Sequence, residues 1–175
     1  FKISESFFRG KFLNSKINGD INFKKNFFFN LNLDINDLNL RKFLLYYFSK
    51  NNNNSYFTLG SSKKINGQLK IQSRSANSFF GKISNAKCLL LFQNGDIEIK
   101  KGSIELYKNS KLKFDVLYTE NEKTPRIEFS TRFSTDDYGK FLKKFEVYDV
   151  DEKKTFSVVQ GVIYLEDRAL KIKNI

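Results

Sequence analysis

Three runs in the stretch Gly95 to Phe145 decide the fold: G-D-I-E-I-K-K-G-S-I-E-L-Y (95–107), K-L-K-F-D-V-L-Y (111–118) and R-I-E-F-S-T-R-F-S-T (126–135). Apolar side chains alternate with charged or polar ones in each run. Successive side chains of a strand point to opposite faces, so this alternation predicts one apolar and one charged face. Gly, Asn and charge clusters bound the runs and are typical of turns. We therefore expect a meander of antiparallel strands with one apolar side.

The period changes after the third run. Tyr138, Phe141, Leu142 and Phe145 recur at i, i+3, i+4 and i+7, which is one face of a short helix. We expect Thr135 or Asp136 to cap its first turn.

The remainder of the chain continues the pattern. Alternating strands are expected at 17–23, 27–35, 56–60, 65–71, 79–83, 88–92, 156–165 and 170–172, the last two forming a hairpin turned at Glu166–Arg168. A second helical stretch is expected from Leu38 to Phe48, started by Asn36–Asp37. The Asn-rich loop at residues 50–55 is the best candidate for an internal boundary.

Two patterns recur within the chain. An apolar-x-Gly-x-apolar pattern surrounds Gly19, Gly67 and Gly161, with looser copies at Gly81 and Gly95. A strand that runs into Asp and ends in Lys-Phe-Leu occurs at 31–44 and again at 127–142. Repeats built from strands favour a stacked β architecture, in which each unit buries its apolar face against its neighbours. The expected fold class is mainly β, a long curled antiparallel sheet with two short helices.

The length and the first residue of the chain indicate its domain organisation. The 175 residues start with Phe1 and contain no Met, and we interpret residues 1–175 as a single segment of a longer protein. No run approaches the ~18 apolar residues that cross a bilayer. Any membrane anchor is therefore expected outside this segment.

The chain carries a formal net charge of +12. One interpretation is an acidic partner, either nucleic acid or anionic lipid headgroups. The other is the composition bias of an AT-rich genome, since Lys, Asn, Ile and Phe dominate together. The lysines are dispersed over polar strand positions without a five-residue basic block, which favours an ordinary solvated face.

The residue types argue against catalysis. There is no His, so the usual general base, metal ligand and partner of a Ser or Cys nucleophile are missing. The single cysteine, Cys88, excludes an internal disulfide and a Cys-based metal site, and we expect it to be a small buried hydrophobe. Asp136–Asp137 is best explained by helix capping. The sequence predicts no enzyme, no cofactor and no metal site.

Nucleic acid is also disfavoured as a partner. Sheets that bind RNA expose aromatic side chains among basic ones, whereas here the aromatics share a face with Ile, Leu and Val. That pattern is typical of a core or an apolar groove.

The segments from Ile17–Ile21 through Asp37 to Leu45, and from Gly95 through Phe145 to Gly161–Ile163, carry a family resemblance. Their alternating strands, Asp and short Phe/Leu helices resemble the AsmA-like family of bacterial envelope proteins. The resemblance implies a curled β-sheet with a hydrophobic concave groove, on the periplasmic side of the inner membrane and anchored by an N-terminal helix. It implies roles in moving phospholipids toward the outer membrane and in outer-membrane integrity and protein assembly, with envelope proteins as further partners. The high lysine and asparagine content departs from common members, and we attribute it to genome composition.

The alternating pattern itself, with its single apolar sheet face, is compatible with such a groove. If two short helices leave that face partly uncovered, it suits lipid acyl chains, because each buried CH₂ contributes about 0.8 kcal/mol. The residues predicted to line the groove are Ile97, Ile99, Ile104, Leu106, Leu112, Phe114, Val116, Ile127, Phe129 and Phe133. Two alternatives remain open: a closed structural β-domain of an envelope protein whose core these residues form, and a basic sheet that binds nucleic acid or acidic glycans.

Overall fold

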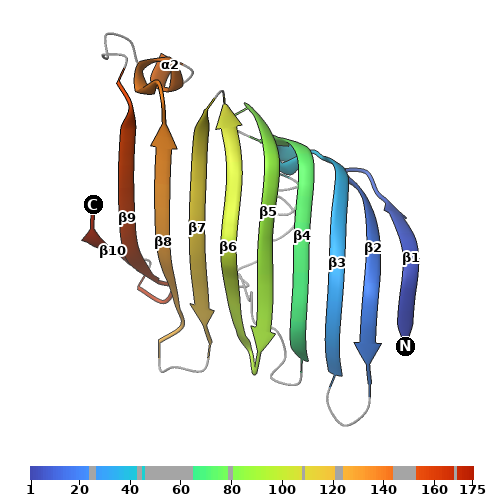
Figure 1. Cartoon of the computed structure of the whole chain (residues 1–175). Helices are drawn as coiled ribbons and strands as arrows, with labels where there is room; N and C mark the ends of the chain where they lie inside the picture. The colour runs from blue at the N-terminus through green and yellow to red at the C-terminus, as the bar shows by residue number, and fades with distance from the viewer. Residues whose placement is uncertain are drawn as a thin grey trace.

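The computed structural model describes residues 1–23, 27–42, 45, 65–78, 81–107, 109–120, 124–143, 153–167 and 169–175. Ten strands form one sheet whose spatial order equals their order in the chain (Figure 1). The strands are β1 (Lys2–Arg9), β2 (Leu13–Asn22), β3 (Phe27–Leu38), β4 (Ile65–Ser78), β5 (Gly81–Gln93), β6 (Asp96–Tyr107), β7 (Ser110–Thr119), β8 (Arg126–Thr135), β9 (Thr155–Tyr164) and β10 (Ala169–Asn174).

The sheet is mixed and open. Neighbouring strands pair antiparallel except β3 and β4, which run parallel from Phe27↔Ile65 to Ile35↔Ser73. β1 and β10 are the two edges, and the sheet does not close on itself. The predicted class, a mainly β curled sheet with two short helices, is confirmed. The expectation of antiparallel pairing is wrong at β3–β4. There the intervening residues 39–64 are long enough for the crossover that parallel strands require.

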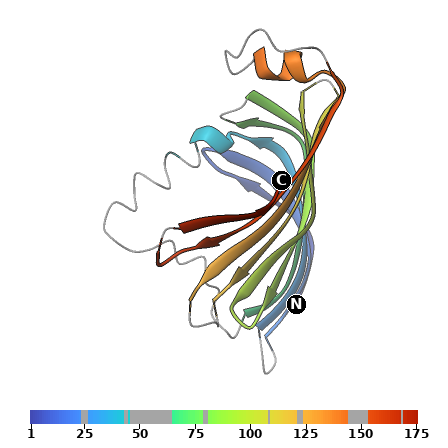
Figure 2. The same cartoon turned by 90° about the vertical axis from the view of Figure 1, so that its left-hand side faces the viewer.

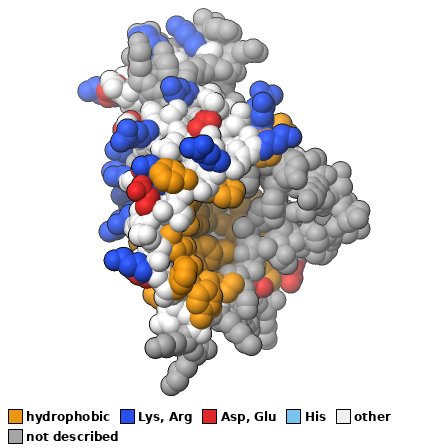
Figure 3. Space-filling view, turned by 90° about the vertical axis from the view of Figure 1, so that its right-hand side faces the viewer, with side chains coloured by type: hydrophobic (Ala, Val, Ile, Leu, Met, Phe, Trp, Pro, Cys, Tyr) orange, Lys and Arg blue, Asp and Glu red, His pale blue; other side chains and the backbone are white. Residues whose placement is uncertain are grey.

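The sheet bends into a trough-like shape with a concave and a convex face (Figure 2). Hydrophobic side chains gather in the hollow of the sheet, while Lys and Arg side chains lie along its outer side (Figure 3). The alternating pattern of the strands explains this division, because one set of side chains points inward and the other outward.

A β-bulge in β6 keeps the apolar side chains on one face. Ile99 pairs with Val116, and the next aligned pair is Gly102 with Phe114. Lys101 takes up the extra residue with a φ of 55°, and its N–H donates to Asp115 Oδ1 at 2.8 Å. Without this bulge, Ile99 and Ile104 would point to opposite faces, because they are an odd number of residues apart.

The two helical segments begin later than predicted. Strand β3 continues to Leu38, Leu40 to Lys42 and Leu45 are helical, and the Asn39 side chain accepts the Lys42 N–H at 3.0 Å. The second helix, α2 (Tyr138–Lys143), is capped by Asp137, whose Oδ1 accepts the Lys140 N–H at 2.9 Å. The cap is thus Asp137, the second residue of the pair Asp136–Asp137 that the sequence assigned to capping. Neither Thr135 nor Asp136 is the cap itself: Thr135 is the last residue of β8, and its Oγ1 accepts the Asp137 N–H at 3.2 Å.

Several predictions fall on residues that the structure does not describe. They are the loop and boundary at 50–55, the strand at 56–60, most of the helix to Phe48, and Phe145 and Arg168. Residues predicted as separate strands at 79–83 and 88–92 belong, from Gly81 onward, to the single strand β5.

The glycines of the recurring apolar-x-Gly-x-apolar pattern occupy two kinds of position in the fold. Gly19, Gly67 and Gly161 lie within strands β2, β4 and β9, whereas Gly81 starts β5 and Gly95 lies in the turn between β5 and β6. The looser copies are therefore turn glycines and not units of a repeat.

Candidate functional site

The ten residues predicted to line a groove share the concave face of β6, β7 and β8. The cross-strand pairs Ile99↔Val116 and Val116↔Phe129 continue one row, and Leu112↔Phe133 belongs to another. Ile97 and Ile127 both oppose Tyr118, while Ile104 opposes Leu112 and Leu106 follows two residues later on β6. The structure therefore brings the predicted set together on one surface.

This surface continues over strands that the prediction did not include. Leu69 pairs with both Leu31 and Leu90, and Leu90 pairs with Ile99. A neighbouring row joins Leu33, Ile71 and Cys88. Their alternation is visible in the sequence, but their alignment with Ile99 depends on strand register. We call the whole concave surface, from β3 to β8, the apolar trough.

The predicted groove residues are neither buried nor fully exposed. Each of the ten predicted residues is partly exposed. Among described residues the buried hydrophobic side chains are Phe29, Ile35, Ala76, Ile83, Tyr118 and Val162. None of the ten belongs to that set, so the trough keeps apolar surface that nothing in the described part of the chain covers completely.

Phenylalanine rings lie over glycines along the trough. Phe29, Phe114 and Phe129 are the direct cross-strand partners of Gly67, Gly102 and Gly161. A Cβ added at these glycines would stand 2.8, 2.5 and 2.8 Å from the respective rings. The missing side chains let the rings lie flat over the neighbouring strand, an arrangement that also pins strand register.

The two ends of the trough differ. At one end, α2 packs on the sheet with the Phe133 and Phe141 ring centroids 4.7 Å apart. Toward the other end, Phe29 lies 5.8 Å from Phe27 and 5.3 Å from Phe92. One end is therefore covered by a short helix, and the other is lined by aromatic rings of β3 and β5.

Two titratable side chains report the apolar environment. Burial raises the pKa of the Cys88 thiol, which lies on the trough face opposite Ile71. Burial, and to a lesser degree the charges of Glu120 and Asp96, raise the pKa of the Tyr118 hydroxyl. Both shifts disfavour a charged form, as expected where water is partly excluded.

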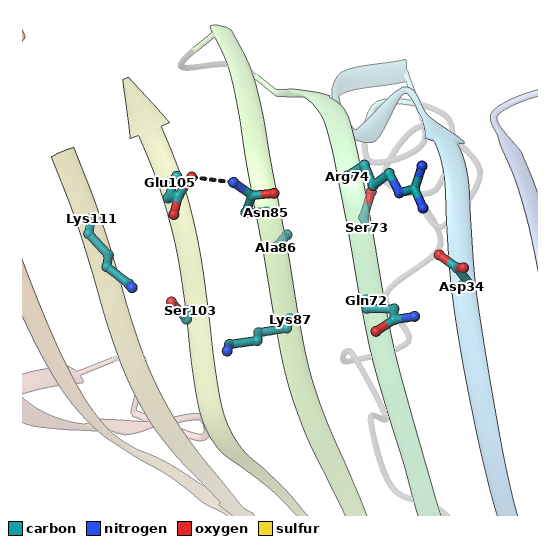
Figure 4. A pocket seen from close by; sticks show the side chains of 10 residues that line it. All are labelled: Asp34, Gln72, Ser73, Arg74, Asn85, Ala86, Lys87, Ser103, Glu105 and Lys111. Atoms are coloured by element: carbon teal, nitrogen blue, oxygen red, sulfur yellow. Dashed lines mark hydrogen bonds between the residues drawn. The ribbon is translucent and has the colours of Figure 1, made fainter. Parts of the chain in front are cut away.

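Charges are confined to the convex face and the edges of the sheet. Toward the β5–β6 turn they are paired: Lys100 with Glu98 at 3.1 Å, and Arg126 with Glu128 at 2.9 Å. A polar hollow of about 360 Å³ lies on this face. Figure 4 shows the side chains that line it, among which Glu105 accepts a hydrogen bond from Asn85. A second hollow, lined by residues of β5 to β8, lies beside it on the same face.

Comparisons with family models, curated proteins and solved structures find no match for this chain. Within the described ranges, no cluster of three or more Cys, Asp or Glu side chains is placed to hold a metal ion. In the same ranges, neither helical segment is long and apolar enough to cross a membrane.

Proposed function

We propose that the protein binds lipid acyl chains in the apolar trough. The observation that carries this proposal is the continuous strip of partly exposed Ile, Leu, Val and Phe side chains on the concave face, joined strand to strand from Leu31 to Phe129. Contiguous exposed apolar surface of this kind marks a binding site for an apolar partner.

An acyl chain matches the shape and chemistry of this strip. Its rows of side chains run across several strands without an interposed charge, so an extended hydrocarbon has apolar contact along its length. Each CH₂ removed from water contributes about 0.8 kcal/mol. A headgroup would remain at an uncovered end of the trough, since α2 already packs on the end at Phe133.

We further propose a cellular role that rests on the family resemblance together with this trough. The segment would belong to a bacterial protein anchored in the inner membrane by a region outside it, with the trough on the periplasmic side. There it would carry phospholipids between inner and outer membrane, and so support outer-membrane biogenesis and protein assembly.

Native mass spectrometry of the protein purified in mild detergent tests lipid binding. We expect phospholipid to be retained in a defined ratio, and to be lost in Phe114→Asp, which places a charge in the trough. Leu117→Asp is the matched control, because Leu117 lies on the same strand but on the convex face and is 37 % exposed.

Folding of each variant is checked by circular dichroism. If Phe114→Asp unfolds, Val116→Asp replaces it, since Val116 lies in the same trough without a glycine beneath it. A folded, lipid-free wild type, or equal lipid loss in Leu117→Asp, would contradict the proposal and favour a closed structural β-domain.

A further inference from the structure

The convex face carries a cluster of positive charge that the strand register creates. Five cationic side chains from β5, β6, β7 and β8 line an open hollow of about 390 Å³, together with the single carboxylate of Asp115. We call it the cationic hollow, and its cations are Lys87, Lys101, Lys111, Lys113 and Arg132.

These cations are left without carboxylate partners. In the described part of the chain, none of the five forms an ion pair. The two nearby carboxylates accept other hydrogen bonds: Asp115 from the backbone N–H of Lys101, and Glu105, directly opposite Lys111, from the Asn85 side chain. Figure 4 shows Lys87 and Lys111 reaching from β5 and β7 toward Ser103 on the strand between them.

The pairing of like charges is unfavourable for the sheet itself. Lys113 and Arg132 are direct cross-strand partners, and like charges in that position destabilise an antiparallel pair. Elsewhere on the same face, β6 and β8 carry Glu98 and Glu128 and pair them with cations.

We propose that the cationic hollow binds a compact anion that carries phosphate groups, either a phospholipid headgroup or a soluble phosphate ester. A phosphate group, singly charged in a diester headgroup and nearly doubly charged in a monoester, meets several donors at once. The fork of Arg132 would bind its oxygens in a bidentate manner while the lysines act as point charges. The hydroxyl groups of Ser103 and Ser130, which also line the hollow, add neutral donors. Its volume of about 390 Å³ admits a headgroup-sized ligand.

This site is independent of lipid in the apolar trough, because it lies on the opposite face. The two sites share only the bulge at Lys101, which turns Gly102 and Phe114 toward the trough and leaves Lys101 at the hollow.

The test uses inorganic tripolyphosphate as the soluble probe, measured by calorimetry at low salt. Lys113→Gln with Arg132→Gln should weaken binding at least about tenfold, because each charge-assisted hydrogen bond that is lost accounts for about that factor. The matched control is Lys70→Gln with Lys82→Gln. It removes the same charge from exposed positions of β4 and β5 outside the hollow and should bind as wild type does.

A second arm uses vesicles of phosphatidylglycerol in phosphatidylcholine to identify the source of the phosphate. If the protein binds the vesicles but not tripolyphosphate, and only the hollow variant loses this binding, the ligand is a membrane headgroup. If the protein binds both probes, the ligands of the hollow include soluble phosphate esters. Ile127→Asp, a trough variant on β8 whose residue does not line the hollow, should bind tripolyphosphate as wild type does, so loss of lipid in the trough and loss of phosphate in the hollow are distinguishable. Equal loss in both double variants, or no binding of either probe, would overturn the proposal.

Discussion

The ring of Phe114 on β7 lies over Gly102 on β6, so closely that a Cβ at Gly102 would stand 2.5 Å from the ring. The pair sits where the bulge at Lys101 realigns β6 with β7. It therefore connects the register of the sheet to the shape of the trough surface.

Gly102→Ala is expected to lower the free energy of unfolding by about 1–3 kcal/mol, the usual cost of overpacking. The reason is steric, because the added methyl group displaces the Phe114 ring. Urea unfolding followed by circular dichroism measures the loss. In the double variant with Phe114→Leu the two costs should be less than additive; full additivity would show that the ring does not depend on this glycine.

Lys113→Glu is expected to stabilise the sheet by roughly 0.2–1 kcal/mol, because it replaces a like-charge cross-strand pair with an opposite-charge one. Lys70→Glu, with no cation directly opposite on β3 or β5, should give no such gain. The comparison is made by urea unfolding at low salt. If Lys113→Glu is no more stable than wild type, Lys113 and Arg132 do not repel each other in the folded protein.

Much of the fold could be predicted from sequence because alternation is local. The strands around Ile97 to Phe133 and their shared apolar face follow directly from side-chain period. The parallel β3–β4 pair could not be predicted, since the direction of β4 depends on where the connection of residues 39–64 returns to the sheet, and local alternation does not specify this.

The parts of the site that were missed all depend on register. A bulge at Lys101 has no local signal beyond Lys-Lys-Gly, which is also typical of a turn. The lysines of the cationic hollow are dispersed along the sequence and meet only because four strands align them. The Asp137 cap differs from the expected one because pairing extends β8 as far as Thr135.

Cys88 provides a reporter inside the trough. Burial raises the pKa of its thiol, so at a given pH less thiolate is present than for a free cysteine, and modification by iodoacetamide should be slow near neutral pH. The rate should rise as pH increases beyond the usual thiol pKa of about 8.5. Bound phospholipid should slow it further. Rates measured by mass spectrometry that are unchanged by lipid would place the lipid elsewhere.

The cap of α2 should respond to acid. Hydrogen bonds from Lys140 hold the pKa of the Asp137 carboxyl below its usual value. A depressed folded-state pKa stabilises the helix above the unfolded pKa, and this contribution is lost as pH falls through the lower folded value. Amide chemical shifts of α2 should therefore show a titration below the usual aspartate pKa. In Asp137→Asn, whose side chain still caps without titrating, this change should be absent; its persistence would assign it to another group.

The most direct test of lipid binding in the apolar trough is photo-crosslinking with a phospholipid that carries a diazirine on its acyl chain. After illumination, adducts are located by tandem mass spectrometry. Lipid in the apolar trough predicts adducts on concave-face residues such as Val116, Phe129 and Leu90, with none at Leu117. Adducts confined to convex-face residues, or none above a free-diazirine control, would contradict it.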